Sequence, residues 1–148
     1  GHYDAIILAS AGLKRLGLAE RIRHTLTPEI SLPAVGQGAL GLECRTHDQA
    51  VLDLIQPLLH ADTDACVRAE RAFNAYLEGG CQVPIAGYAT LKEGVISIEG
   101  RVGSVDGAVL LRAQRTGKIA DAEQLGIQLA KDLLDQGAGE LLKTLYSN

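Results

Sequence analysis

The stretch that decides the fold is residues 84–115, which read PIAGYATLKEGVISIEGRVGSVDGAVLLRAQR. It contains three runs rich in apolar and β-branched residues, at 84–91, 95–102 and 108–115. Between these runs lie Lys92-Glu93-Gly94 and Ser104-Val105-Asp106-Gly107, which have the polar residues and glycines of turns. Short strands joined by such turns pair antiparallel with their neighbours in the chain. The stretch therefore predicts a three-stranded antiparallel meander.

A helix is predicted immediately before the meander, over residues 61–78. Small and apolar side chains recur there at intervals of three and four, which places them on one face of a helix. They are Ala65, Ala69, Ala72, Phe73, Tyr76 and Leu77. Asp62 or Asp64 is suited to cap the start, because a short carboxylate accepts hydrogen bonds from the N–H groups of the first turn. Gly79 or Gly80 is expected to end the helix.

Two further helices are predicted after the meander, a longer one that ends at Gly137 and then a short one. Their apolar residues are Ala122, Leu125, Leu129, Leu133 and Leu134, followed by Leu141, Leu142 and Leu145. Helices packed on one face of an antiparallel sheet form an α+β domain. Residues 61–148 are therefore predicted to be a carboxyl-terminal α+β domain that folds by itself.

Residues 1–60 predict pieces of α/β structure. Residues 4–9 form an apolar run typical of a buried strand, residues 13–22 predict a short helix, and residues 40–44 predict a second strand. Thr46 and Gln49 have the spacing of a capping box for one more helix. Two strands do not make a stable sheet. We therefore expect α/β fragments whose sheet partners lie elsewhere.

The composition excludes several classes of protein. The formal net charge is −4 and no basic stripe is present, which argues against nucleic acid as a partner. The longest apolar runs are far too short for a membrane span. The three cysteines have no close spacing, so we expect no metal site and a cytoplasmic, reducing environment. The chain has no methionine, and we expect it to be the later part of a longer protein.

Cys81 is the side chain with the clearest potential for chemistry. It follows Gly79 and Gly80, between the predicted helix and the first predicted strand. Because glycine permits backbone geometries that other residues do not, the thiol can be held out of the core. A thiolate at such a place can form a stable thioether with a carbon electrophile. Cys44 and Cys66, in a predicted strand and a predicted helix, are expected to be packing residues.

Three stretches of the chain together resemble the porphobilinogen deaminase family, also called hydroxymethylbilane synthases. They are residues 70–86 (ERAFNAYLEGGCQVPIA), 4–17 (DAIILASAGLKRLG) and 32–40 (LPAVGQGAL). In the family these are the cofactor-attachment signature, a strand and turn leading to a carboxylate-binding arginine, and the crossover that lines the cleft. The resemblance implies that residues 1–38 end domain 2, residues 39–60 return to domain 1, and residues 61–148 are domain 3.

The resemblance implies a transferase of tetrapyrrole and heme biosynthesis. Its reaction deaminates four porphobilinogen molecules and joins them head to tail into hydroxymethylbilane. The pyrrole chain grows on a dipyrromethane cofactor, which the resemblance places in thioether linkage on Cys81. The implied partners are porphobilinogen, the growing pyrrole chain and the amino-terminal half of the same protein, which is implied to be a monomer at full length.

The resemblance also implies non-covalent binding roles. Arg15 matches the family's carboxylate-binding arginine, a task for which the planar guanidinium fork is suited. Ala9, Ser10, Gln37 and Gly38 match positions that line the cleft, where backbone and amide groups can hydrogen-bond pyrrole substituents. The family's catalytic aspartate lies in the amino-terminal half. We therefore expect no catalytic residue in this chain and no turnover from it alone.

Two other interpretations stay open. Pieces of α/β structure with an arginine in a cleft also occur in non-catalytic anion-binding or ligand-binding modules, in which Cys81 would be an incidental loop thiol. A thiol enzyme with Cys81 as its nucleophile would need a histidine base at a recognisable spacing. The histidines are scattered and are expected on the surface: His2, His24, His47 and His60. A covalent adduct on Cys81 would argue against the binding module.

Overall fold

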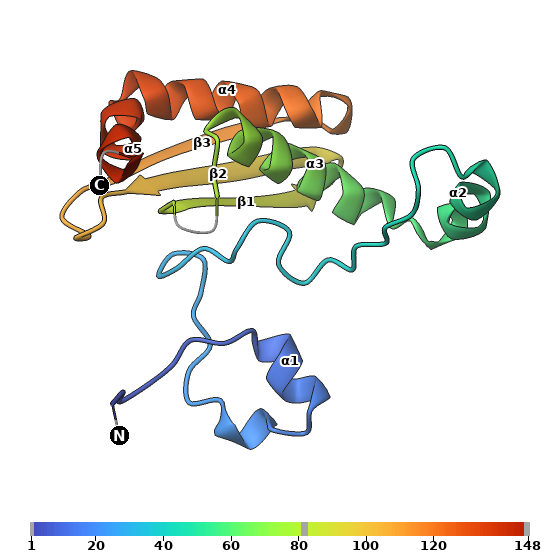
Figure 1. Ribbon diagram of the computed structural model, residues 1–148, viewed down its shortest axis with the longest axis horizontal. Coiled ribbons are helices and arrows are strands. Elements are labelled where there is room, and N and C mark those ends of the chain that lie inside the picture. Colours follow the sequence, from blue (N-terminus) through green and yellow to red (C-terminus); the bar gives the residue numbers. More distant parts are fainter. Residues whose placement is uncertain (1, 81–82, 147–148) are drawn as a thin grey trace. The chain divides into compact units, whose positions relative to one another are not determined.

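The computed structural model describes residues 2–80 and 83–146, the last three of these by their backbone only (Figure 1). The chain divides into two compact units, residues 1–32 and residues 33–148. The domain boundaries predicted after residues 38 and 60 stay predictions. Within the described residues, no helix combines the length and the apolar character needed to cross a membrane.

The first unit contains a short helix, α1 (Ser10–Arg15), and a single 3-10 turn, η1 (Ala19–Arg21). Gly17 follows α1 in the left-handed conformation, with a φ of +72°, and its N–H donates to the Lys14 carbonyl at 3.1 Å. This geometry ends a helix, because it turns the chain away from the helix axis. The bounds of the helix predicted over residues 13–22 are therefore wrong.

Neither strand predicted in residues 1–60 forms. Residues 4–9 and 40–44 are irregular, and Ile7 is 82% exposed. A strand has to pair its backbone N–H and C=O groups with a neighbouring strand. Within residues 2–60 the structure describes no strand that could serve as that neighbour. Both strand predictions are wrong because an apolar run by itself does not supply the partner.

Helix α2 (Gln49–Ile55) forms where a helix was predicted, and it continues into the 3-10 turn η2 (Gln56–Leu58). Its N-cap is Asp48, whose Oδ1 accepts a hydrogen bond from the Val51 N–H at 3.3 Å. The capping box predicted from Thr46 is wrong, because the capping residue directly precedes the first helical residue. Asp48 occupies that position.

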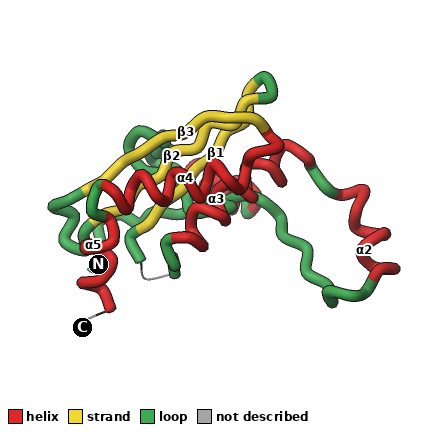
Figure 2. The backbone as a smooth tube through the Cα atoms, turned by 90° about the horizontal axis from the view of Figure 1, so that it is seen from above, coloured by secondary structure: helices red, strands yellow, loops and turns green. Residues whose placement is uncertain are grey.

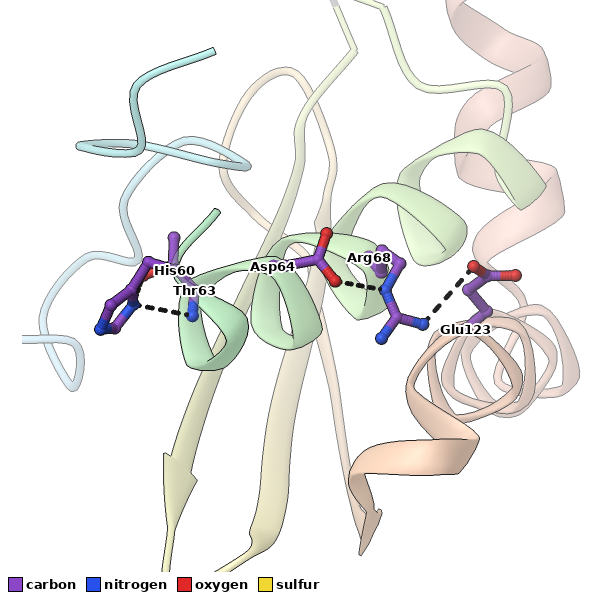
Figure 3. A network of polar contacts seen from close by, with 5 residues as sticks. All are labelled: His60, Thr63, Asp64, Arg68 and Glu123. Carbon is purple, nitrogen blue, oxygen red and sulfur yellow. Dashed lines mark hydrogen bonds and ion pairs between the residues drawn. The ribbon is translucent and has the colours of Figure 1, made fainter. Parts of the chain in front are cut away.

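Helix α3 (Ala61–Tyr76) is capped by His60, and not by Asp62 or Asp64 as predicted (Figure 3). The His60 ring nitrogen Nδ1 accepts the Thr63 N–H at 3.3 Å. Because this acceptor precedes the helix, the two aspartates fall within its first turn. Their negative charges are favourable there, next to the positive end of the helix dipole.

The predicted meander is confirmed. Strands β1 (Ile85–Lys92), β2 (Val95–Gly103) and β3 (Leu110–Lys118) form an antiparallel sheet in the order β1-β2-β3. Glu93 and Gly94 make the first turn, with φ of +51° and +78°. Two central residues with positive φ are the geometry of a tight two-residue hairpin.

The third strand begins two residues later than predicted, because the turn before it is longer. The Ser104 Oγ accepts the Val109 N–H at 2.9 Å, and the Asp106 Oδ1 accepts the Ala108 N–H at 3.1 Å. These hydrogen bonds keep residues 104–109 in the turn.

Helices α3 and α4 (Ala122–Asp135) cover the same face of the sheet, and α5 (Ala138–Tyr146) packs against α4 and β2 (Figures 1 and 2). Gly137 lies between α4 and α5 with a φ of +100°, and it ends α4 as predicted. The largest fully buried side chains lie between the layers: Phe73, Ile96, Ile98, Val102, Leu129 and Leu133. The predicted α+β class, with helices on one face, is confirmed.

Phe73 fixes α3 on the sheet. Its ring lies over Gly87 and Gly100, which face each other across β1 and β2. A Cβ built on either glycine would lie 2.7 Å from a ring carbon. A side chain at either glycine would therefore clash with the ring. This close contact holds α3 against the sheet.

An ion pair between β3 and α4 predicts a pH-dependent contribution to stability. Arg115 donates to both Asp132 oxygens at 2.6 Å, and this hydrogen bonding, then the charge of Arg115, lowers the pKa of Asp132. A lowered pKa stabilises the fold above the carboxyl's unfolded pKa of about 3.9, and that stability is lost as the pH falls through the folded pKa. We expect Asp132→Asn to lower the thermal midpoint at pH 7, and the difference from wild type to shrink as the pH falls below about 3.9.

The matched control for that prediction is Asp135→Asn, the same change in the last turn of α4. A negative charge is unfavourable at the carboxyl end of a helix, so the control should leave the midpoint unchanged or slightly raised. Thermal melts followed by circular dichroism at pH 7 and at pH 2 provide the measurement. An equal loss for Asp132→Asn at pH 7 and pH 2 would show that the Arg115 pair contributes nothing.

Candidate functional site

Cys81 lies outside the described residues, but both flanks of its loop are anchored. On the helix side, the Gly79 N–H donates to the Asn74 carbonyl at 2.9 Å, and the Asn74 side-chain amide donates to the Gly79 carbonyl at 3.1 Å. On the strand side, the Val83 N–H donates to the Gly80 carbonyl at 3.1 Å. We call residues 79–83 the attachment loop. The fold joins it directly to the end of α3 and the start of β1.

The two glycines before Cys81 have different roles. A Cβ built on Gly79 would lie 2.2 Å from the Asn74 side-chain oxygen, so a larger residue would displace the side chain that holds the Gly79 carbonyl. Among the described residues other than its chain neighbours, a Cβ built on Gly80 has no heavy atom within 4 Å. The prediction that a glycine ends α3 is wrong, because the chain already turns at Glu78, which has a φ of +54°. Gly79 serves close packing, and Gly80 borders open space.

Gln37 and Gly38 lie in two overlapping β-turns. The Gln37 N–H donates to the Ala34 carbonyl at 2.9 Å, and the Ala39 N–H donates to the Gly36 carbonyl at 3.0 Å. Gly36 and Gly38 occupy the third positions of these turns, with φ of +69° and +88°. A type II turn requires a positive φ at that position. We call residues 34–39 the double turn, and it leaves the Gln37 side chain exposed.

Glu70, in the middle of α3, binds the double turn. The residue is only 5% exposed. The Oε2 atom accepts the Gly36 N–H at 2.7 Å, and Oε1 accepts the Ala89 N–H of β1 at 2.8 Å. Glu70 was missed by the reasoning from sequence. The signal that could have found it is a carboxylate next to Ala69, on the buried face of an amphipathic helix.

The other three non-covalent candidates lie around α1 in the first unit. Ala9 is the N-cap of α1, Ser10 is its first residue and Arg15 is its last. At a rise of 1.5 Å per residue, the two ends of this helix are separated by roughly 8 Å. The Arg15 side chain is exposed, and it forms no ion pair with any residue that the structure describes. Its guanidinium is therefore available to an anionic ligand.

The site residues predicted from sequence thus fall into two groups. Ala9, Ser10 and Arg15 belong to the first unit, while Gln37 and Gly38 belong to the second, together with the anchors of the attachment loop. The second group is connected through α3 and Glu70. In the described residues, no group of three His, Cys, Asp or Glu side chains is arranged to hold a metal ion.

The two remaining cysteines occupy partly buried positions. Cys66 lies in α3 and packs against the core, and burial, with the nearby charges of Glu70 and Asp62, raises the pKa of its thiol. A thiol with a raised pKa holds its proton and is a poor nucleophile. Cys44 is half-buried in an irregular segment and not in the predicted strand. The packing role expected for Cys66 is consistent with this environment.

Comparison with protein families identifies the chain. Residues 65–135 match the family model described as porphobilinogen deaminase, C-terminal domain. Residues 1–53 match the model described as porphobilinogen deaminase, dipyromethane cofactor binding domain. The two matches cover most of the chain in the order that the resemblance implied. The chain belongs to the porphobilinogen deaminase family.

Porphobilinogen deaminases are transferases of tetrapyrrole and heme biosynthesis that use porphobilinogen as substrate and a dipyrromethane cofactor. The residues of this chain fit such a group. The attachment loop is anchored at both ends and borders open space at Gly80. An exposed guanidinium, Arg15, is available for the carboxylates that pyrrole rings carry. Ala9, Ser10, Gln37 and Gly38 also lie within the range that matches the cofactor-binding model.

Proposed function

We propose that this chain holds the dipyrromethane of a hydroxymethylbilane synthase as a thioether on Cys81. The observation that carries the proposal is the anchored attachment loop, which α3 and β1 hold on either side of Cys81 next to open space. Cys66 is less suited, because it packs against the core and its pKa is raised. A thioether suits a cofactor that stays on the enzyme, since it is stable to water and to thiols.

Each of the other candidate residues has a binding task in this proposal. Arg15 binds the acetate and propionate carboxylates of cofactor or substrate through its two parallel N–H donors. Ala9, Ser10, Gln37 and Gly38 hydrogen-bond pyrrole substituents along the cleft. When bound, the dipyrromethane supplies the pyrrole carbon on which porphobilinogen units are joined. The role of this chain is to hold and orient that carbon.

The proposal extends to the partners and the compartment. We propose that the chain works with the amino-terminal half of the family's enzyme, which carries the catalytic aspartate, and that the growing pyrrole chain lies between them. The complete protein acts as a monomer in the cytoplasm. An odd number of cysteines without close spacing supports the reducing compartment.

Intact mass spectrometry followed by peptide mapping tests the attachment. In protein taken from cells that make tetrapyrroles, we expect the mass of the chain plus one dipyrromethane, located on the peptide that contains Cys81. An unmodified Cys81 peptide in protein that turns over porphobilinogen would contradict the proposal. An unmodified Cys81 peptide in protein that also fails to turn over porphobilinogen together with its amino-terminal half would favour the alternative, a ligand-binding module with an incidental loop thiol.

The role of Arg15 predicts a specific loss on substitution with lysine. Lysine keeps the charge but not the planar fork, so a carboxylate loses one of two parallel hydrogen bonds. In enzyme competent for turnover, we expect Arg15→Lys to raise the KM for porphobilinogen by about tenfold, as the loss of one charge-assisted hydrogen bond implies. The thermal midpoint should not change, because Arg15 is exposed.

Arg21→Lys is the matched control, since it makes the same change at another exposed arginine of the first unit. Steady-state kinetics of both variants, with thermal melts alongside, provide the measurement. If both variants show wild-type kinetics, Arg15 belongs to the solvated surface.

A further inference from the structure

Glu70 has an unusual position for a carboxylate. It is 5% exposed, on the face of α3 that carries the fully buried Ala69 and Phe73. Burying a charge is costly unless hydrogen bonds compensate for the lost water. Here the compensation comes from two backbone N–H groups, of Gly36 and Ala89. An apolar side chain at this position would avoid that cost. We therefore look for the reason for a carboxylate in the two segments that it binds, the double turn and β1.

On one side, Glu70 binds the double turn through the Gly36 N–H, which makes no hydrogen bond within the turn. The first turn is closed by the Gln37 N–H and the Ala34 carbonyl. The Gly36 N–H between them is left to point outward, and Glu70 accepts it at 2.7 Å. Gln37 and Gly38 follow immediately in the chain. A single hydrogen bond from α3 therefore sets the position of both candidate cleft residues.

On the other side, Glu70 lies on α3 and binds β1, the two elements that flank the attachment loop in the chain. Asn74, whose side-chain amide donates to the Gly79 carbonyl, lies one helical turn after Glu70 on α3. Ala89, whose N–H Glu70 accepts, lies in β1, the strand that leaves the loop. β1 is an edge of the described sheet, so this N–H is satisfied from α3. One carboxylate thus connects the double turn with the two elements that precede and follow Cys81 in the chain.

We propose that Glu70 is a positioning residue that fixes the double turn, with Gln37 and Gly38, relative to the attachment loop. The contact itself stands on the structure, and its consequence for the pyrrole chain rests on the proposed function. Loss of the contact should leave loading of Cys81 intact, because Asn74 and Val83 still anchor the loop. It should weaken the binding of pyrrole units, because Gln37 and Gly38 would then lie on a turn whose position is no longer fixed.

The test is Glu70→Gln, which keeps the shape of the side chain. An amide has one acceptor oxygen, so it can accept only one of the two N–H groups, and its NH₂ group faces the other. The Ala89 N–H is buried, and leaving it unsatisfied costs more than releasing Gly36 at the partly buried turn. We therefore expect Gly36 to lose its acceptor. Glu123→Gln, an exposed change on α4, is the control.

The first readout is amide hydrogen exchange of the peptide covering residues 33–39. In Glu70→Gln we expect it to exchange about tenfold faster than in wild type, as loss of one hydrogen bond to a charged acceptor implies. Exchange in the core of α3 and β2 should not change, and Glu123→Gln should match wild type throughout. Unchanged exchange over residues 33–39 would overturn the proposal.

The second readout separates positioning from simple packing. In enzyme competent for turnover, intact mass counts the pyrrole units on the protein after it is mixed with porphobilinogen. We expect Glu70→Gln to carry the cofactor normally and to accumulate fewer added units, with a higher KM. Faster exchange with normal elongation would overturn the positioning role. A cofactor-free Cys81 in wild type as well would instead refute the proposed function, and the exchange result would stand.

Gly36→Ala is a second variant, for the case that Glu70→Gln does not fold. It changes the residue whose N–H donates to Glu70. Apart from its chain neighbours, no described residue has a heavy atom within 4 Å of a Cβ on Gly36, so the change strains the backbone, whose φ is +69°. The core and α3 are not touched. We expect the same faster exchange over residues 33–39 and the same elongation defect. Wild-type exchange and elongation in Gly36→Ala would overturn the proposal.

Discussion

Replacing Cys81 with serine is expected to abolish both the dipyrromethane adduct and the activity that depends on it. The reacting species is a thiolate, and a serine hydroxyl does not ionise near neutral pH, so no ether forms in place of the thioether. Serine is close to cysteine in size and the attachment loop is anchored by other residues. The thermal midpoint of the variant should therefore stay near that of the unloaded wild type.

The controls for this prediction are the other two thiols. Cys44→Ala and Cys66→Ala should both keep the adduct and the activity. Cys66→Ala removes a partly buried side chain that packs against the core, so we expect it to lose about 1–2 kcal/mol of stability. Intact mass, kinetics and urea unfolding of the three variants distinguish attachment from packing. An adduct retained in Cys81→Ser would move the attachment to another residue.

The part of the fold that could be predicted from sequence is the part held by local signals. The turn at Glu93 and Gly94 needs only its own two residues to reverse the chain, and the strands on either side then pair with each other. Gly137 likewise ends α4 through its own backbone conformation. In each case the evidence lies within a few residues of the feature. Prediction of the meander and its covering helices succeeded for that reason.

Some of the wrong predictions concern features that depend on residues far away in the chain. The runs at residues 4–9 and 40–44 have the composition of strands, but strand formation depends on a partner that composition does not reveal. The end of α1 was a different kind of failure, since Gly17 was visible in the sequence and its left-handed role was overlooked. His60 as a cap was missed because short carboxylates are the commoner acceptors at that position.

The candidate site shows the same division. The thiol on a short loop after two glycines could be recognised from neighbouring residues alone. Glu70 could not, because its two partners lie 34 and 19 residues away and both are backbone N–H groups, which every non-proline residue has. A buried carboxylate on an apolar helix face was the only sequence signal. Even that signal gives no indication of which segment the carboxylate holds.

The second large effect is expected from Gly126→Ala, which should separate α3 from α4. A Cβ on Gly126 would lie 2.1 Å from the Ala69 carbonyl oxygen and 2.8 Å from the Phe73 nitrogen. Both are backbone atoms of α3, so a rotamer change cannot relieve the clash and the helices have to move apart. Both helices also carry fully buried alanines, whose small side chains allow helices to approach closely: Ala65, Ala69, Ala122 and Ala130.

We expect Gly126→Ala to cost about 3 kcal/mol or more, the upper range for overpacking in a core. Gly139→Ala in α5 is the matched control, because its Cβ would meet the Leu134 side chain at an ordinary 3.6 Å. Alanine is the better helix former by about 1 kcal/mol, so the control should be neutral or stabilising. The same one-atom change should thus have opposite signs in two helices, measured by urea unfolding. Equal midpoints for Gly126→Ala and wild type would show that α3 and α4 do not approach each other at Gly126 as closely as the structure has them.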